Sequence, residues 1–296
     1  MNNQDFVSPQ FISYAQNFED VMLWRALKLF GPGHYVDVGA NHPTLDSVTR
    51  SLYERGWRGI NVEPVQHYYQ ALCDERPQDT NLCVAVGDKE GELVFFESAD
   101  TGLSTLSHEM AELQQAEGIP FLQRTVQTKR LVDVCDQYLP VSAPFHFLKI
   151  DVEGFERNVL QGMDFQRWRP WIILIESAFD KTPEWEALIL QAGYEPALCD
   201  GINRYYVAAE RRELLVPLAL PPNILDEFQL CRGHRLSHPL KDVDQAQDQL
   251  TSMRQRAEAA EARLAAIYGS RLWSVVRLLT AGRGRLKTLL SSRFNG

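Results

Sequence analysis

The sequence predicts an α/β protein built on a doubly wound, mostly parallel sheet that closes with an antiparallel hairpin. Three observations predict this fold. Residues 34–210 alternate between short apolar segments and amphipathic segments. The first apolar segment runs into an acid, a glycine and a tight turn, and the last two flank the turn sequence Asp200-Gly201-Ile202-Asn203. Hydrophobic residues make up 45% of the 296 positions and charged residues 23%, a composition typical of a globular chain with a sizeable core.

The first half of the predicted sheet comes from short apolar segments with turn residues at their ends. Helical spacing of apolar residues predicts helices over 45–55 and 65–75 in this half. Residues 99–128 are less regular, with one helix expected over 107–115, and we interpret them as an insertion or lid. Strands are predicted at 34–38, 59–63, 81–86 and 92–96.

The second half of the sheet repeats this pattern. Strands are predicted at 145–150 and 171–175, with a helix from about Phe155 between them. Residues 194–198 and 204–208 are expected to form the closing hairpin, because a turn sequence separates them.

The charge distribution argues against nucleic acid as a partner. The net charge is −9, from 30 basic and 39 acidic residues, whereas proteins that bind phosphate backbones present a basic surface. The charge is uneven, because the chain after residue 261 carries seven basic residues and no acid, which leaves −16 on residues 1–261. An acidic body therefore precedes a basic tail.

Cysteine content and hydropathy predict a cytoplasmic protein. The five cysteines are odd in number and form no CxxC pair, which indicates reduced thiols. The first residues, Asn2-Asn3-Gln4-Asp5, lack the basic and apolar regions of a signal peptide, and no apolar run reaches membrane-spanning length. We expect a soluble protein that contacts the inner face of a membrane at most peripherally.

The composition changes near residue 240, which predicts a domain at 1–240, a helix at 241–268 and a basic amphipathic tail at 269–296. The helix is predicted to form a short coiled coil for self-association or a partner protein, or else to be a linker helix lying on its own domain. The tail suits peripheral membrane contact, a partner helix or packing on the body. Apolar residues at alternating gaps of three and four mark the coiled-coil seam: Val243, Ala246, Leu250, Met253, Ala257, Ala260, Leu264 and Ile267.

The turn after the first strand carries the clearest ligand-binding signal. Asp37 and Gly39 end an apolar strand, and Ala40, Asn41 and His42 follow. Because Gly39 has no side chain, the backbone can turn sharply there and approach a ligand closely. A dinucleotide site would need more glycines to accommodate a pyrophosphate, so this turn disfavours NAD or FAD.

Acids at the ends of the next two strands extend this pattern. Glu63, followed by Pro64, lies 24 residues beyond Gly39, where an acid can accept two hydrogen bonds from a ribose diol. Asp88 follows the third strand and is a candidate acceptor for an adenine amino group. These features suit S-adenosylmethionine, which carries an adenosine but no pyrophosphate.

Six blocks of the sequence make the chain resemble the FkbM family of S-adenosylmethionine-dependent methyltransferases. The most diagnostic is the Lys-Ile-Asp-Val-Glu-Gly run at 149–154. The resemblance implies a class I methyltransferase fold and O-methylation, commonly of sugar hydroxyls or other secondary-metabolite hydroxyls. The blocks lie at residues 13–20, 37–41, 61–64, 101–105, 148–156 and 200–204.

The resemblance also implies roles outside the first two strand ends. In the N-terminal block, Gln16 and Glu19 are expected to contact the cofactor from a flap, and helix capping by Asn17 is the alternative. The later blocks supply candidate substrate-binding residues, which lie on a small polar loop that gates the substrate or forms a surface turn, and beside the hairpin turn. These residues are Ser104, Thr105, Asn203 and Arg204.

Methyl transfer to a sugar hydroxyl calls for a base, and a positioned base contributes about 10²–10⁴ in rate. Asp151 is the favoured base, with Glu153 just beyond it and Glu176 at the end of the next core strand. On neighbouring strands, the Asp151 and Glu176 carboxylates would raise one another's pKa or bind a divalent cation such as Mg²⁺. Helix capping is the alternative for Asp151, and His42 is a further candidate base.

Other functions stay open at this point. A nucleic-acid methyltransferase is disfavoured, because the chain has neither an Asn/Asp-Pro-Pro-aromatic run nor a Pro-Cys pair. A noncatalytic scaffold that recruits glycan-synthesis enzymes to a membrane is a second alternative, although it would not need Asp37, Gly39 and Glu63. A nucleotide-sugar or NAD enzyme is a third. The expected acceptor is a surface glycan, its precursor or a glycosylated metabolite.

Overall fold

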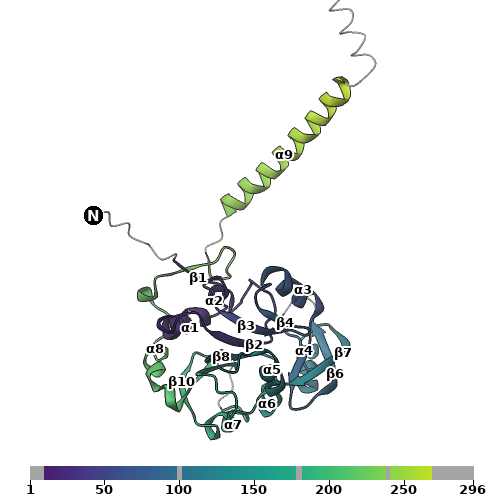
Figure 1. Cartoon of the computed structure of the whole chain (residues 1–296). Helices are drawn as coiled ribbons and strands as arrows, with labels where there is room; N and C mark the ends of the chain where they lie inside the picture. Colours follow the sequence, from purple (N-terminus) through teal and green to yellow (C-terminus); the bar gives the residue numbers. More distant parts are fainter. Residues whose placement is uncertain (1–9, 99–101, 178–181, 238–240, 269–296) are drawn as a thin grey trace, which may run out of the picture. The chain divides into compact units, whose positions relative to one another are not determined.

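Seven strands form the central sheet of the computed structural model (Figure 1), which describes residues 10–98, 102–177, 182–237 and 241–268. Five strands run parallel, and β11 is antiparallel to both of its neighbours, β9 and β10. This confirms the predicted doubly wound sheet with an antiparallel hairpin. Across the sheet the order is β10 (Tyr194–Cys199), β11 (Asn203–Ala208), β9 (Ile172–Glu176), β8 (Phe145–Ile150), β2 (His34–Val38), β3 (Arg58–Val62) and β4 (Thr80–Leu82).

The strand order reverses between β2 and β8. From β2 the chain winds outward through β3 to β4, and it then returns to the other side of β2 with β8 and β9. In such sheets ligands bind outside the carboxyl ends of the strands, at the point where the order reverses. The fold therefore places a binding crevice beyond Val38 and Ile150.

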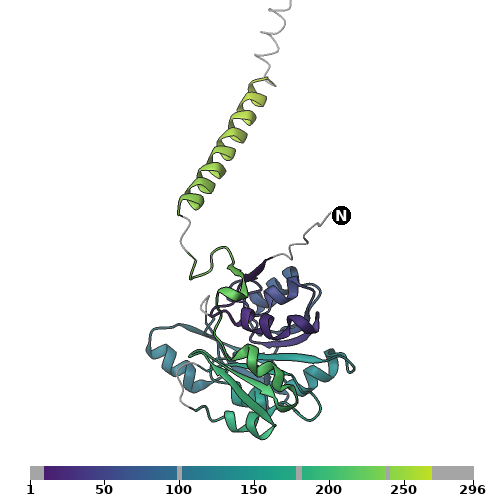
Figure 2. The same ribbon diagram turned by 90° about the vertical axis from the view of Figure 1, so that its left-hand side faces the viewer.

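Helices cover both faces of the sheet (Figure 2). Because side chains alternate along a strand, β2 directs Val36 and Val38 into one core cluster and Tyr35 into the other. The first cluster includes side chains from α5 (Leu131–Tyr138), α6 (Glu156–Gln161) and α7 (Glu186–Gln191). The second includes side chains from α1 (Glu19–Leu27), α2 (Arg50–Glu54) and α8 (Leu215–Leu218). Helix α3 spans Gln66–Glu75.

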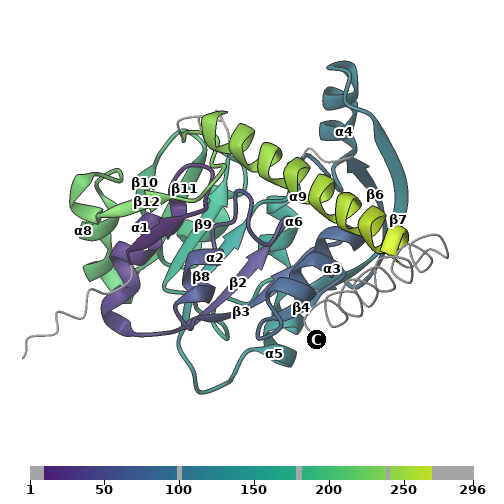
Figure 3. The same ribbon diagram turned by 90° about the horizontal axis from the view of Figure 1, so that it is seen from above.

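A second, three-stranded sheet lies beside the β4 end of the central sheet (Figure 3). It consists of β5 (Ala85–Gly87), β7 (Phe121–Arg130) and β6 (Gly91–Ser98), and α4 (His108–Ala116) connects β6 to β7. The expectation of one strand at 81–86 is wrong, since β4 and β5 belong to different sheets. The irregular segment also contains most of β7, whose side chains are largely exposed, so no apolar alternation marked it as a strand.

Two local expectations are also corrected. The helix predicted over 45–55 is confined to α2, because the preceding loop is held by the buried Arg76, which donates to the Pro43 carbonyl and to the Thr49 hydroxyl. Asn17 does not cap α1. The cap position is Phe18, in a left-handed conformation, and no side chain accepts a capping hydrogen bond there.

The remaining elements lie toward the two ends of the described chain. Strands β1 (Phe11–Ser13) and β12 (Phe228–Leu230) pair in parallel. The short helices η1 (Lys28–Phe30), η2 (Ala209–Leu214) and η3 (Ile224–Asp226) complete the first of two units, residues 1–237. The second unit, 238–296, contains α9 (Lys241–Tyr268), and the predicted basic tail at 269–296 lies outside the described residues. No helix in the described ranges has the length and apolarity to cross a membrane.

Candidate active site

A cavity opens at the carboxyl ends of β2 and β3, where the topology places a crevice. Its empty space is about 620 Å³, including the part open to solvent. We call it the donor cavity. Most of the walls are apolar, and polar groups come from the strand ends and from the loop before α4. This combination of apolar walls and a few polar groups is typical of small-molecule sites. The lining residues include Gly39, Asn41, Glu63, Pro64, Tyr68, Val86, Phe95, Ser104, Thr105, Leu106 and Asp151.

Gly39 allows the turn after β2 to pass against the turn after β8. Its φ is +77°, and a Cβ atom built on it would lie 1.8 Å from the backbone oxygen of Asp151. Any other residue would therefore force the two strand ends apart. Its amide donates to the Val62 carbonyl, which also fixes the turn against β3.

Glu63 is buried at the end of β3, and its carboxylate joins two backbone segments. One oxygen accepts the Val65 amide at 2.7 Å, and the other accepts the Asn41 amide at 2.8 Å. Each carboxylate oxygen keeps a second lone pair that can accept a hydroxyl of a bound ribose. Burial raises the pKa of Glu63 to about 7, although these two amides oppose the shift.

Asn41 adds an unsatisfied acceptor to the same cavity. It adopts a left-handed conformation with φ +50°, which asparagine tolerates better than most residues. Its buried side-chain oxygen has no hydrogen-bond partner among the described residues. Because an unpaired buried acceptor is costly, this oxygen is suited to accept a hydrogen bond from a bound ligand. The free acceptor and the close turn at Gly39 together fit the predicted adenosyl ligand.

The next residues of the turn have different roles. Of the residues described, those lining the donor cavity do not include Ala40 or His42. The Nδ1 atom of His42 accepts the amides of Thr44 and Leu45, and burial lowers the histidine pKa. The imidazole is therefore neutral at pH 7 and holds the loop, while its ring lies edge-on to Tyr68 of the cavity wall.

Asp37 lies beneath the cavity rather than in its wall. It is opposite Lys149 in the register of β2 and β8, and the Lys149 ammonium lies 3.3 Å from its carboxylate. The other Asp37 oxygen accepts the Thr49 hydroxyl. Lys149 also donates to the Gly39 carbonyl at 2.6 Å and lies 3.1 Å from Asp151. This single buried cation connects the glycine turn to the carboxylate after β8.

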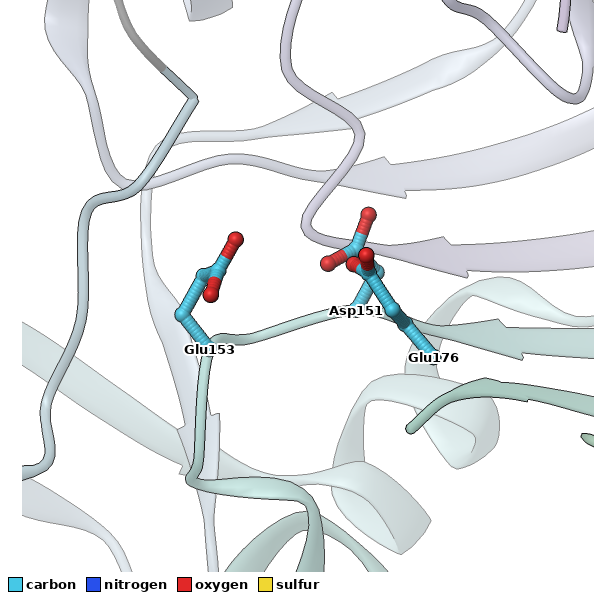
Figure 4. Close-up of side chains that lie close together, drawn as sticks. All are labelled: Asp151, Glu153 and Glu176. Carbon is cyan, nitrogen blue, oxygen red and sulfur yellow. The ribbon is translucent and has the colours of Figure 1, made fainter. Parts of the chain in front are cut away.

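Asp151, Glu153 and Glu176 come together at the ends of β8 and β9 (Figure 4). One oxygen from each carboxylate lies within 4.8 Å of the other two. Asp151 and Glu176 lie at the ends of adjacent strands, and Glu153 reaches toward them from the loop that follows β8. Glu153 has φ +51°, an uncommon conformation for a glutamate, and such backbone outliers are concentrated at functional sites.

The three carboxyl groups differ in pKa because only Asp151 contacts the lysine. Burial opposes ionisation of Asp151, but the Lys149 charge and a hydrogen bond with Glu176 outweigh it and lower the Asp151 pKa. Burial, together with the Asp151 hydrogen bond and charge, raises the pKa of Glu176 to about 10. Burial and the neighbouring acids raise the pKa of Glu153 to about 8. At pH 7 Asp151 is therefore ionised and Glu176 is protonated.

A second cavity borders this carboxylate cluster. Its empty space is about 1280 Å³, including the part open to solvent, and we call it the acceptor cavity. Glu153 and Glu176 line it, whereas Asp151 lines the donor cavity. The cluster of three carboxylates therefore borders both cavities. Other lining residues come from α4, α6 and the start of α7, and include Ser107, Met110, Leu113, Arg157, Asn158 and Trp185.

The loop before α4 also contributes to this site. The side chains of Ser104 and Thr105, which the sequence assigns to substrate, line the donor cavity. The Thr105 hydroxyl donates to the Glu153 carbonyl at 2.6 Å, so the loop fastens the backbone that carries one of the three carboxylates. Thr101 of the same predicted block lies outside the described residues.

Two residues predicted in different sites meet each other instead. Glu19 is buried, and its carboxylate accepts the Asn203 side-chain amide at 2.7 Å and the Asn17 amide at 2.8 Å. Asn203 is opposite Glu176 in the register of β11 and β9, so this pair lies next to the strand that carries a cluster carboxylate. The structure thus gives the N-terminal block an anchoring contact at the edge of the site.

Three other predicted residues lie apart from both cavities among the described residues. Arg204 pairs with Glu186 of α7 and lines a separate hollow over β10 and β11. Asp88 lines another surface hollow, beside the start of α5. Gln16 is half-buried in the turn before α1.

The sequence did not indicate the apolar walls of the two cavities. Tyr68, Phe95 and Leu106 line the donor cavity, and Met110 and Trp185 line the acceptor cavity. They come from helices and strands far apart in the chain, and an apolar residue in such an element is normally read as core. The polar loop before α4 was the one local signal near them.

Comparison with known families agrees with this geometry. A family model described as "Methyltransferase FkbM domain" matches residues 37–196, which is more than half of the chain. This range includes Gly39, Glu63 and the three clustered carboxylates. A comparison with curated proteins finds no match.

Three solved structures to which the chain is similar are described as methyltransferases. The FkbM methyltransferase of Methylobacillus flagellatus has 14% identity and a TM-score of 0.38, over 60% of this chain and 43% of that one. A TehB-like S-adenosylmethionine-dependent methyltransferase of Corynebacterium glutamicum has 6% identity and a TM-score of 0.33, over 63% and 87%. A precorrin-6y C5,15-methyltransferase of Geobacter metallireducens has 11% identity and a TM-score of 0.34, over 70% of this chain and 94% of that one. At these values the likeness says nothing about substrate.

Proposed function

We propose, on the premise that this chain belongs to the FkbM methyltransferase family, that it methylates a sugar hydroxyl with S-adenosylmethionine as donor. The acceptor sugar belongs to a surface glycan, its precursor or a glycosylated metabolite. One observation carries the proposal: Asp151, Glu153 and Glu176 form one cluster, with Asp151 lining the donor cavity and the two glutamates lining the acceptor cavity. That is the position at which a hydroxyl would lose its proton as it attacks.

The donor cavity supplies what an adenosyl ligand needs. The free lone pairs of Glu63 accept the ribose hydroxyls, and the unpaired Asn41 oxygen accepts a further donor of the ligand. The turn at Gly39 leaves room for close backbone approach. When bound, S-adenosylmethionine supplies a methyl group that is already activated for displacement. The protein therefore accelerates the reaction chiefly by positioning, for which well-oriented groups reach roughly 7–11 kcal/mol.

Asp151 acts as the base in this proposal. It is the ionised member of the cluster at pH 7, and Lys149 holds its carboxylate at the edge of the donor cavity. Glu176, which is protonated, hydrogen-bonds to Asp151 and orients it. Glu153, whose pKa is raised to about 8, is mostly protonated at pH 7 and becomes a second proton acceptor only at higher pH.

A divalent cation such as Mg²⁺ is the second candidate for this cluster. Three carboxylates within 4.8 Å of one another are a suitable oxygen donor set. However, Lys149 already places a positive charge 3.1 Å from Asp151, which weakens attraction for a metal ion. We therefore favour proton transfer over metal coordination. A noncatalytic scaffold would not need the buried Asn41 oxygen, which has no hydrogen-bond partner among the described residues. This observation therefore does not support the scaffold alternative.

Two measurements test the proposed function. Calorimetry on the purified chain should show saturable binding of S-adenosylmethionine and of its demethylated product, and no binding of NAD. Incubation with S-adenosylmethionine and a panel of glycosides should then give an O-methyl sugar, identified by mass spectrometry after hydrolysis. If the folded protein binds neither S-adenosylmethionine nor its demethylated product, the proposed function is wrong. A methyl group found on nitrogen or carbon contradicts the acceptor chemistry.

A further inference from the structure

Helix α9 carries an apolar stripe along its length. The helix runs without a break from Lys241 to Tyr268. The bulkiest members of this stripe among the described side chains are Leu250 and Met253. Helices in water normally owe most of their stability to burial of such a face.

The apolar positions follow the repeat of a coiled coil. Within the described side chains, Leu250, Met253, Ala257 and Ala260 follow one another at gaps of three, four and three. In the sequence, Val243 and Ala246 continue the spacing on one side, and Leu264 and Ile267 continue it on the other. The bulky members thus lie toward both ends of the seam, with small ones in its middle. Repeats of this kind occupy the a and d positions of paired helices.

We propose that α9 pairs with α9 of a second copy of this chain as a parallel, in-register coiled coil. The charged residues that flank the seam favour a second copy of this helix as the partner and a parallel orientation of the two helices. Next to the seam, Arg254 and Glu261 occupy e positions, and Arg256 and Arg263 occupy g positions. In a parallel pair each g residue faces the following e residue of the other helix. Arg256 then faces the partner's Glu261, and the symmetry of the pair repeats this contact.

An antiparallel pair would set like charges together as well as opposite ones. In that arrangement g positions face g positions and e positions face e positions, so Arg256 would meet Arg263 of the second helix while Arg254 would meet its Glu261. Like charges across the seam are repulsive, whereas the parallel register brings none of these residues against a like charge. One helix therefore carries both halves of the ion pair, which favours a second copy over an unrelated protein.

The test measures the oligomeric state of the full chain by analytical ultracentrifugation over a range of concentrations. Because alanines bury little area, we expect a concentration-dependent monomer–dimer equilibrium. Leu250→Asp should abolish the dimer. Glu261→Arg should weaken it at least tenfold, and Arg256→Glu combined with Glu261→Arg should restore it. Glu258→Arg changes a charge on the outer face and is the matched control, with no effect expected.

Disulfide trapping tests the direction of the pair. The five native cysteines are free thiols, so the variants are made in a Cys199→Ser background, which removes the exposed one. Ala257→Cys and Ala260→Cys, introduced separately, should each form disulfide-linked dimers under mild oxidation. An antiparallel pair permits such self-linking at one level only, so linking by a single variant overturns the orientation. A monomer at every concentration, or a dimer that survives Leu250→Asp, overturns the pairing. Unchanged thermal unfolding of the body shows that the variants fold.

Discussion

The donor and acceptor sides of the site are built in different ways. The donor side consists of turns that directly follow β2 and β3, and its key contacts join Gly39, Asn41 and Glu63 through backbone amides. The acceptor side combines the ends of β8 and β9 with α4, α6 and α7, and its carboxylates interact with one another. The backbone contacts of the donor side hold its ligand-binding groups in place. The interactions among the carboxylates of the acceptor side set their protonation states. Binding and chemistry should therefore be separable by mutation.

The largest expected separation comes from Asp151→Asn. This change removes the ionised carboxylate of the cluster but keeps its size, so kcat should fall by about 10²–10⁴ while donor affinity changes little. Steady-state kinetics and calorimetry measure the two quantities. Glu176→Gln is the matched control, because Glu176 is already protonated at pH 7 and glutamine preserves a neutral donor. If Glu176→Gln loses as much activity as Asp151→Asn, the division of roles is wrong.

Gly39→Ala should break both sides at once. The added Cβ meets the Asp151 backbone oxygen, so the turns after β2 and β8 must separate. We expect roughly 2–4 kcal/mol loss of unfolding free energy, with loss of donor binding and turnover together. Chemical denaturation and calorimetry measure these losses. Gly31→Ala, at an open position with nearly the same φ of +75°, controls for backbone strain alone. Equal destabilisation by both variants would remove the steric explanation.

Donor binding should depend on pH through Glu63. Its pKa is raised to about 7 in the free protein, and the ionised form accepts the two ribose hydroxyls more strongly than the protonated form. Bound donor therefore lowers this pKa and releases a proton. Affinity should rise between pH 5.5 and 7 and level off above 8, approaching tenfold per pH unit at the acid end. Calorimetry at several pH values follows the change, and Glu63→Gln should weaken binding and flatten the profile. If donor affinity changes with pH by the same slope in the Glu63→Gln variant, the group that titrates is not Glu63.

The smallest effect is expected from metal removal. Because Lys149 neutralises Asp151, prolonged treatment with EDTA should leave kcat unchanged. The assay compares treated enzyme with and without added Mg²⁺. Restoration of lost activity by Mg²⁺, and no effect in a Glu153→Gln variant, would instead identify the carboxylate cluster as a metal site.

The main sheet and the donor turn were predictable because their signals are local. An apolar strand followed by Gly39, and an acid after the next strand, are recognisable in short stretches of sequence. Strand β7 was not recognisable, since most of its side chains face solvent and its pairing with β6 supplies the order. Arg204 was assigned from the family resemblance and Asp88 from its place after a strand, but both line other hollows.

The sequence by itself determined the α/β fold class, the glycine turn and the identity of the three acids after β8 and β9. Only the tertiary structure decided how those acids behave. Their pKa values depend on burial, on Lys149 and on one another, and a one-dimensional sequence contains none of these distances. The cavity walls were likewise decided by packing, because apolar residues from distant elements line a cavity only when the chain brings them together.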